Sequence, residues 1–153
     1  MTTQKSPLKT LQELAHTRVD EATKHLGELI ASEQAGTVKL QMLQQYRSEY
    51  RERFMETARN GIDPTAWQNY SLFLAKLDDA IHAQQLVVDH SHHATARGQK
   101  QWASEHSRAK AFDTLSHRQE LHEQMRQNKR EQVQSDEHAI KKYRDKQGDG
   151  NDA

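Results

Sequence analysis

The stretch RNGIDPTAWQNY, residues 59–70, decides how the rest of the chain is arranged. It holds Gly61 and Pro64, in a chain with only six glycines and two prolines. Gly61 suits the left-handed backbone position that ends a helix. Asp63 can then cap a second helix that begins with Pro64. We therefore predict two helices joined by a sharp turn at about residues 61–63.

Large apolar side chains surround this turn. Ile62 and Trp67 occupy the two positions of a hydrophobic staple at a helix start. Phe54 would meet Trp67 and Tyr70 across the tip of an antiparallel hairpin, and aromatic rings bury the most area per residue. The residues expected to pack the hairpin tip are Phe54, Gly61, Ile62, Asp63, Pro64, Trp67 and Tyr70.

Before the turn, apolar residues recur at alternating steps of three and four. The repeat runs through Val19, Ala22, Leu26, Leu29, Glu33, Gly36, Leu40, Leu43, Arg47, Tyr50 and Phe54. A mean spacing of 3.5 is typical of a coiled-coil seam. Upstream, Leu8 reaches Val19 through Leu11 and Ala15, and this eleven-residue step predicts a stutter. Ser6 and Pro7 form a plausible helix start.

A second seam of the same spacing follows the turn. Its positions are Trp67, Tyr70, Leu74, Leu77, Ile81, Gln84, Val88, Ser91, Thr95, Gly98, Trp102, Glu105, Ala109 and Phe112. Beyond Phe112 the phase slips and apolar residues become sparse. Pairing outward from the turn uses up the first helix by about residue 115, so the last 30 or so helical residues are expected to lack a partner.

These patterns predict an all-α fold, an elongated antiparallel two-helix coiled-coil hairpin whose second helix is longer than the first. We expect a single domain over residues 1–153. The first helix should cover about 6–60, the turn 61–63, the second helix 64–145 and a disordered tail 146–153.

Composition agrees with a narrow apolar seam. Only 33% of residues are hydrophobic, 29% are charged and the mean hydropathy is −1.10, which fits a compact globule poorly. The 22 basic and 22 acidic residues cancel, so no field favours nucleic acid or anionic lipid. The absence of cysteine excludes disulfides and thiolate chemistry.

The sequence predicts a cytoplasmic protein with no transmembrane segment. The longest apolar runs, LFLA (72–75) and LVV (86–88), fall far short of the roughly 20 residues that span a bilayer. The N-terminus, MTTQKSPLKTLQELA, has no apolar core of a signal peptide.

Motifs of catalysis do not appear, and we expect neither an enzyme, nor a small-molecule substrate, nor a cofactor. The nucleophile-elbow, phosphate-loop and dinucleotide patterns are all missing. DHSHH (89–93) is the densest group of metal-ligand side chains, and a metal-responsive helical protein is one rival hypothesis. A metal site needs a third ligand in most cases, so we favour a solvated polar stretch and expect no metal.

An apolar stripe beside the seam is more informative. Tyr46 and Phe73 should lie at similar height, partly exposed, because a two-helix coil buries one stripe per helix. They either broaden the seam or form a docking patch. The mixed charges of RQNKREQ (126–132) and KKYRDK (141–146) indicate a solvated helix face or an arm that a protein partner holds.

The order of aromatic residues around the turn resembles a known family. LQMLQQYRSEYRERF (40–54), then NGID and WQNYSLFLAKLDDAI (67–81), with the opening LKTLQELAHTRVDEATKHLGEL (8–29), are similar to the FliJ family of flagellar export proteins. The resemblance covers about residues 8–115.

The resemblance implies a non-catalytic coiled-coil hairpin of the type III export apparatus at the flagellar base, peripheral to the inner membrane and needed for motility. Its implied partners are the hexameric export ATPase FliI, whose ring assembly it promotes, the export gate protein FlhA, and export chaperones. The implied gate-binding residues are Leu43, Tyr46, Tyr50, Phe73, Leu77 and Ala80. The implied ATPase-binding residues are Leu11, Leu14 and Arg18. The alternative is a general coiled-coil chaperone or adaptor that has no ATPase-coupling role.

Overall fold

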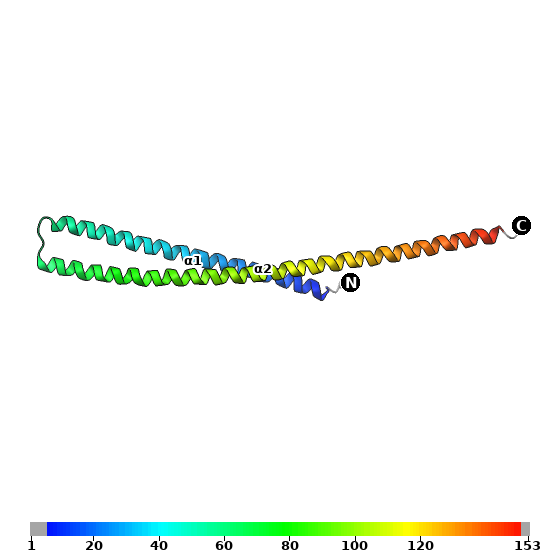
Figure 1. Cartoon of the computed structure of the whole chain (residues 1–153), viewed down its shortest axis with the longest axis horizontal. Helices are drawn as coiled ribbons and strands as arrows, with labels where there is room; N and C mark the ends of the chain where they lie inside the picture. The colour runs from blue at the N-terminus through cyan, green and yellow to red at the C-terminus, as the bar shows by residue number, and fades with distance from the viewer. Residues whose placement is uncertain (1–5, 151–153) are drawn as a thin grey trace, which may run out of the picture. The chain divides into compact units, whose positions relative to one another are not determined.

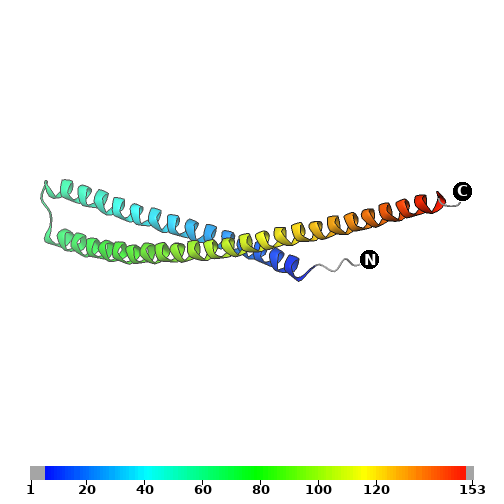
Figure 2. The same ribbon diagram turned by 45° about the vertical axis from the view of Figure 1, so that its right-hand side comes forward.

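The computed structural model describes residues 6–150 and contains two helices in this range, α1 (Pro7–Ala58) and α2 (Pro64–Asp149). The helices pack against each other as a coiled-coil hairpin and α2 is the longer, which confirms the predicted fold class. Within residues 17–106 the two arms run antiparallel and side by side in both views (Figures 1 and 2).

Each helix begins where the sequence predicts. The backbone N–H of Lys9 donates to Ser6 Oγ at 3.3 Å, so Ser6 caps α1 just before Pro7. At the start of α2, the N–H of Thr65 donates to Asp63 Oδ1 at 3.4 Å. α2 continues to Asp149, so residues 146–149 of the predicted disordered tail are helical, and residues 151–153 of that tail lie outside the described range.

The turn depends on one glycine. Gly61 has a φ of 91°, a left-handed conformation that side chains with a Cβ rarely adopt. Its N–H donates to the carbonyl of Ala58 at 3.1 Å, which closes the last turn of α1. The Asp63 carbonyl then accepts from the N–H groups of Ala66 and Trp67 at 3.0 and 3.2 Å, and α2 follows at once.

Chain contacts divide the molecule into two units. One is the closed end of the hairpin, residues 17–106. All eleven predicted seam positions of α1 in this unit are buried or half-buried. The α2 seam positions are also buried or half-buried, except for Trp67, which is 52% exposed and marks the limit of the seam at the turn.

The other unit combines residues 6–16, described from Ser6, with residues 107–150. Here the predicted stutter is wrong. Leu11 is 47% exposed, whereas Gln12 is half-buried and Ala15 is 3% exposed. The inward positions Leu8, Gln12 and Ala15 therefore keep the steps of four and three, because Gln12 has a polar partner on α2.

Beyond Ser116, α2 has no buried side chain in the part of the chain that the structure describes. Ala109 is 3% exposed and Phe112 and Ser116 are half-buried, but every residue from 117 to 149 is exposed. In Figure 1 the orange and red end of α2 has no other segment beside it. We refer to residues 117–149 as the free arm.

Candidate protein-binding surfaces

Six aromatic rings form a continuous series from the turn along the hairpin. Phe54 and Tyr70 stack with centroids 3.6 Å apart, and Trp67 lies 5.7 Å from Phe54. Tyr50 stacks on Tyr70 at 5.6 Å. Tyr70 is only 5% exposed, so the centre of this series belongs to the core and holds the tip of the hairpin together.

The series ends at a surface that contains the residues implied to bind the gate. Phe73 lies 4.6 Å from Tyr50 and 6.3 Å from Tyr46, edge to face with the latter. Tyr46 is 44% exposed and Phe73 is half-buried, which confirms that both rings are partly exposed at similar height. α1 thus supplies one exposed ring and α2 the half-buried ring that orients it.

The structure brings the six implied gate residues to one region but does not expose all of them. Leu77 is 8% exposed, and Leu43 and Tyr50 are half-buried in the seam. Ala80 is exposed, one heptad after Phe73. Direct contact with a partner is therefore open to Tyr46, Ala80 and the edge of Phe73, whereas Leu77 can only support them from below.

The residues implied to bind the ATPase lie near the start of α1. Leu11 and Leu14 are each 47% exposed, and neither occupies the seam. Arg18 is exposed as well and belongs to the unit of residues 17–106. Two exposed leucines three residues apart are neighbours on a helix surface and need an explanation beyond the packing of the hairpin.

Polar contacts between the helices gather on one flank of the hairpin unit. Arg47 on α1 donates to the Asp78 carboxylate on α2, and His92 Nδ1 lies 2.9 Å from Glu33 Oε1. Trp102 Nε1 donates to Thr23 Oγ1 at 2.9 Å. Asp78 and His92 are two heptads apart, so the contacts of these two residues lie along the same edge of α2, which we call the clasped flank.

The unit of residues 6–16 and 107–150 has a contact of the same kind. The Gln12 side-chain amide donates to Asp113 Oδ1 at 2.7 Å, and His16 Nε2 lies 2.7 Å from the same oxygen. Hydrogen bonds from Gln12 and His16 lower the pKa of Asp113, which favours the ionised carboxylate. This contact accounts for the half-buried Gln12 at an inward position.

Hydrogen bonding also lowers the pKa of Glu33. The principal cause is the bond with His92, followed by a bond from Thr95. The pKa of Arg47 is raised by its hydrogen bond and charge interaction with Asp78. The clasped flank therefore uses charged and polar side chains to align the two helices where the seam itself is polar.

The DHSHH segment contributes one residue to this clasped flank. His92 is within hydrogen-bond distance of Glu33, and the ring centroids of His92 and His93 are 6.2 Å apart. No group of three potential metal-ligand side chains occurs among residues 6–150. The contact with Glu33 gives His92 a role in helix alignment that sequence reasoning missed, because it depends on the register between the arms.

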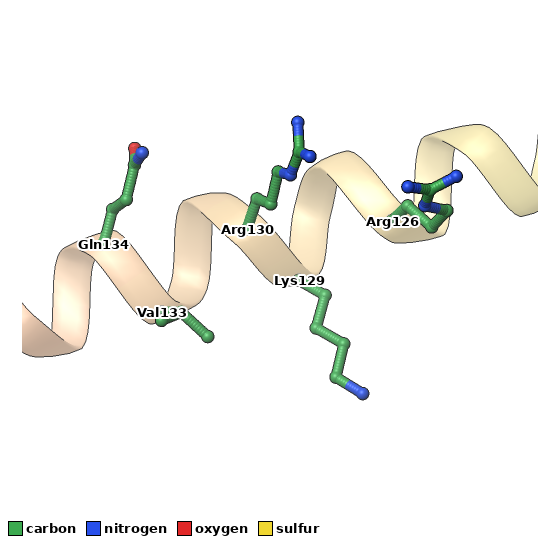
Figure 3. Close-up of a pocket in the computed structure, with 5 residues that line it drawn as sticks. All are labelled: Arg126, Lys129, Arg130, Val133 and Gln134. Carbon is green, nitrogen blue, oxygen red and sulfur yellow. The ribbon is translucent and has the colours of Figure 1, made fainter.

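The free arm carries a surface hollow lined by Arg126, Lys129, Arg130, Val133 and Gln134. Figure 3 shows Arg126, Arg130 and Gln134 on one side of the helix, with Lys129 and Val133 on the other. The hollow is therefore a space between side chains of a single helix. Arg126 pairs with Glu123 at 3.8 Å, which fits a solvated mixed-charge face, one of the two interpretations that the sequence left open.

Further exposed apolar residues escaped sequence reasoning. Val87 and Leu86 on α2 are 51% and 58% exposed, and Met42 on α1 is 66% exposed. Val87 follows Phe73 and Ala80 at intervals of seven residues, and this repeat outside the seam was the signal that could have found it.

No described helix is long and apolar enough to cross a bilayer. Together, the paired helices, the polar clasped flank and the exposed aromatic surface define a class of protein, a coiled-coil helical hairpin suited to contact other proteins.

Comparison with known proteins identifies the family. The profile of the family described as flagellar FliJ protein matches residues 4–148. The flagellar FliJ protein of Salmonella typhi is 32% identical over 136 residues, which cover 89% of this chain and 92% of the relative. The flagellar FliJ protein of Escherichia coli (strain K12) is 32% identical over 132 residues, covering 86% and 90%. The chain belongs to the flagellar FliJ protein family.

Proposed function

We propose that this chain is a non-catalytic stalk component of the flagellar type III protein export apparatus. The family match over residues 4–148 is the observation that carries the proposal. The coiled-coil hairpin supports it, because paired helices can transmit force between partners without chemistry of their own. The protein would act in the cytoplasm, at the inner-membrane face of the flagellar base.

In this proposal one chain has two protein partners besides export chaperones. Leu11, Leu14 and Arg18 contact the hexameric export ATPase FliI and promote assembly of its ring. The aromatic surface around Tyr46 and Phe73 contacts the export gate protein FlhA. Hydrolysis of ATP in the ring would then alter the contact between the hairpin and the gate. The exposure of Leu11, Leu14 and Tyr46 supports these assignments.

The test is ATP hydrolysis by the purified export ATPase of the same organism, diluted until ring assembly limits the rate. We expect this chain to stimulate hydrolysis, with saturation well below one chain per ATPase subunit. The Leu11→Ala/Leu14→Ala variant should stimulate weakly. Leu72→Ala/Val38→Ala, which truncates two side chains that are 59% and 53% exposed elsewhere, should stimulate normally.

An unchanged rate, with intact helical circular dichroism, would contradict the ATPase-coupling role and favour a coiled-coil chaperone or adaptor. Equal stimulation by both variants would instead reject Leu11 and Leu14 as the contact, while leaving the stalk function in place.

A further inference from the structure

The free arm carries an apolar stripe that no other described residue covers. Its large apolar side chains fall within about a third of the helix circumference at 3.6 residues per turn, and they extend for about 33 Å at 1.5 Å per residue. All of them are between 48% and 70% exposed, and they are Leu121, Met125, Val133, Ile140 and Tyr143. A stripe of this length has the form of a surface that packs against another helix.

Two opposite charges interrupt this stripe. Lys129 lies on the same side of the helix as Val133 (Figure 3), and Asp136 follows Val133 at helix-neighbour spacing. Neither Lys129 nor Asp136 forms an ion pair with another residue of the range 6–150. Neither has an oppositely charged residue three or four positions away, whereas Arg126, off the stripe, pairs with Glu123. The stripe therefore holds one cation and one anion that their own helix cannot pair.

The charges and apolar residues of the stripe are spaced symmetrically about a point between residues 132 and 133. Counting outward from this point reaches Lys129 and Asp136 at the same step, and then Met125 and Ile140 at the same step. A two-fold axis through this point makes each residue of one copy face its counterpart in an antiparallel copy. Lys129 then faces Asp136 and Met125 faces Ile140, and each contact occurs twice.

The ends of the stripe fit the same antiparallel register. Leu121 and Tyr143 come within one residue of facing each other, and His122 faces Tyr143 directly. A parallel, in-register pair would instead place Lys129 against Lys129 and Asp136 against Asp136, and like charges repel. The sequence of the free arm therefore favours one orientation of a second copy.

We propose that the free arm binds the free arm of a second copy of this chain as an antiparallel pair centred between residues 132 and 133. The second copy covers the apolar stripe and supplies the missing partners of Lys129 and Asp136. These two charges set orientation and register, because a parallel or shifted alignment separates them from their partners. The association needs neither the export ATPase nor the gate, so it stands apart from the proposed function.

Disulfide capture tests the register directly, because the chain contains no cysteine of its own. Full-length Met125→Cys and Ile140→Cys variants are oxidised separately and as an equimolar mixture. The mixture should form a linked dimer, since the two positions face each other. Each variant alone should stay unlinked, because its two thiols lie about 22 Å apart in the antiparallel pair. Lys141→Cys, at nearly the same height as Ile140 but off the stripe, is the matched control and should not link to Met125→Cys.

Two results of this experiment would overturn the proposal. Linkage of each single variant to itself as fast as in the mixture would show a parallel or unspecific contact. No linkage in any sample, at the highest concentration at which the chain stays soluble, would show that the free arms do not associate.

Charge reversal tests the ionic contacts, with dimerisation measured by sedimentation equilibrium. Lys129→Asp and Asp136→Lys should each weaken dimerisation about tenfold, because two attractive contacts become repulsive in every dimer. Combining both changes in one chain should restore dimerisation, since opposite charges face each other again. Arg130→Asp, which reverses a charge on the other side of the helix (Figure 3), should stay within about twofold of wild type.

Circular dichroism checks that these variants keep the helix content of wild type. Failure of the combined reversal to recover dimerisation, with helix content intact, would overturn the pairing of Lys129 with Asp136 and with it the proposed register.

Discussion

Gly98 is the glycine of α2 that lies against α1. Its replacement by alanine tests how closely the two helices pack there. A Cβ at Gly98 would stand 2.6 Å from Leu29 Cδ1 and 3.5 Å from Leu26 Cδ1. Carbon atoms pack at about 3.5–4.0 Å, so Leu29 would have to move within a seam that it shares with Leu26. Gly98→Ala therefore adds a methyl group that fits only if the end of the Leu29 side chain shifts.

Two opposing effects set the size of the change. Alanine in a helix interior is more favourable than glycine by about 0.8–1.0 kcal/mol. Overpacking of a well-packed contact costs about 1–3 kcal/mol. The sum predicts that Gly98→Ala leaves the free energy of unfolding unchanged or lowers it by up to about 2 kcal/mol.

Gly27→Ala is the matched control, because a Cβ at Gly27 meets nothing within 4 Å. This variant should gain the full helix preference of about 1 kcal/mol. Urea unfolding followed by far-UV circular dichroism measures both variants against wild type. Equal stabilisation by the two substitutions would refute the close approach of the helices at Gly98.

Three further perturbations test other contacts. Gly61→Ala should lower the free energy of unfolding by about 1–2 kcal/mol, because φ at Gly61 is 91°. The same control, Gly27→Ala, should raise the free energy of unfolding measured in urea. The pKa values of Glu33 and Asp113 lie below their ordinary 4.5 and 3.8. Their ionised carboxylates therefore stabilise the fold at a pH above these ordinary values, and this stabilisation is lost as the pH falls through the lowered pKa. The melting temperatures of wild type and Glu33→Gln/Asp113→Asn should therefore differ near neutral pH and converge in acid; a constant difference would contradict this. Glu105→Leu should raise the melting temperature, because one carboxylate oxygen of Glu105 is buried without a hydrogen-bond partner in the described structure. Such a buried oxygen costs about 1–3 kcal/mol. A lower melting temperature would show that the seam needs this carboxylate.

Local signals in the sequence predicted the fold well. Gly61, Asp63 and Pro64 define the turn through their own backbone preferences, which do not depend on distant residues. The steps of three and four from Val19 to Phe54 identified which side chains face inward, because a coiled coil buries only the stripe with that period. The lengths of α1 and α2 then required a free arm.

The contacts between the arms could not be predicted in the same way. Sequence reasoning chose Leu11 over Gln12 as the inward residue because leucine is apolar, but the register brings Gln12 to Asp113. The register across an antiparallel pair depends on the geometry of the turn, so the pairing of His92 with Glu33 was equally hidden. The exposed side chain of Val87 was missed, since Val87 lies outside the seam from which the sequence reasoning started.

The central claim is that one chain connects the export ATPase to the gate through two separate surfaces. The most direct measurement immobilises the cytoplasmic part of FlhA and asks whether it captures FliI only when this chain is present. The account predicts capture with wild type. Tyr46→Ala/Phe73→Ala should lose capture but still stimulate ATP hydrolysis, and Leu11→Ala/Leu14→Ala should lose capture but still bind the gate. Capture of FliI to the same extent without the chain, or by both variants, would contradict the account.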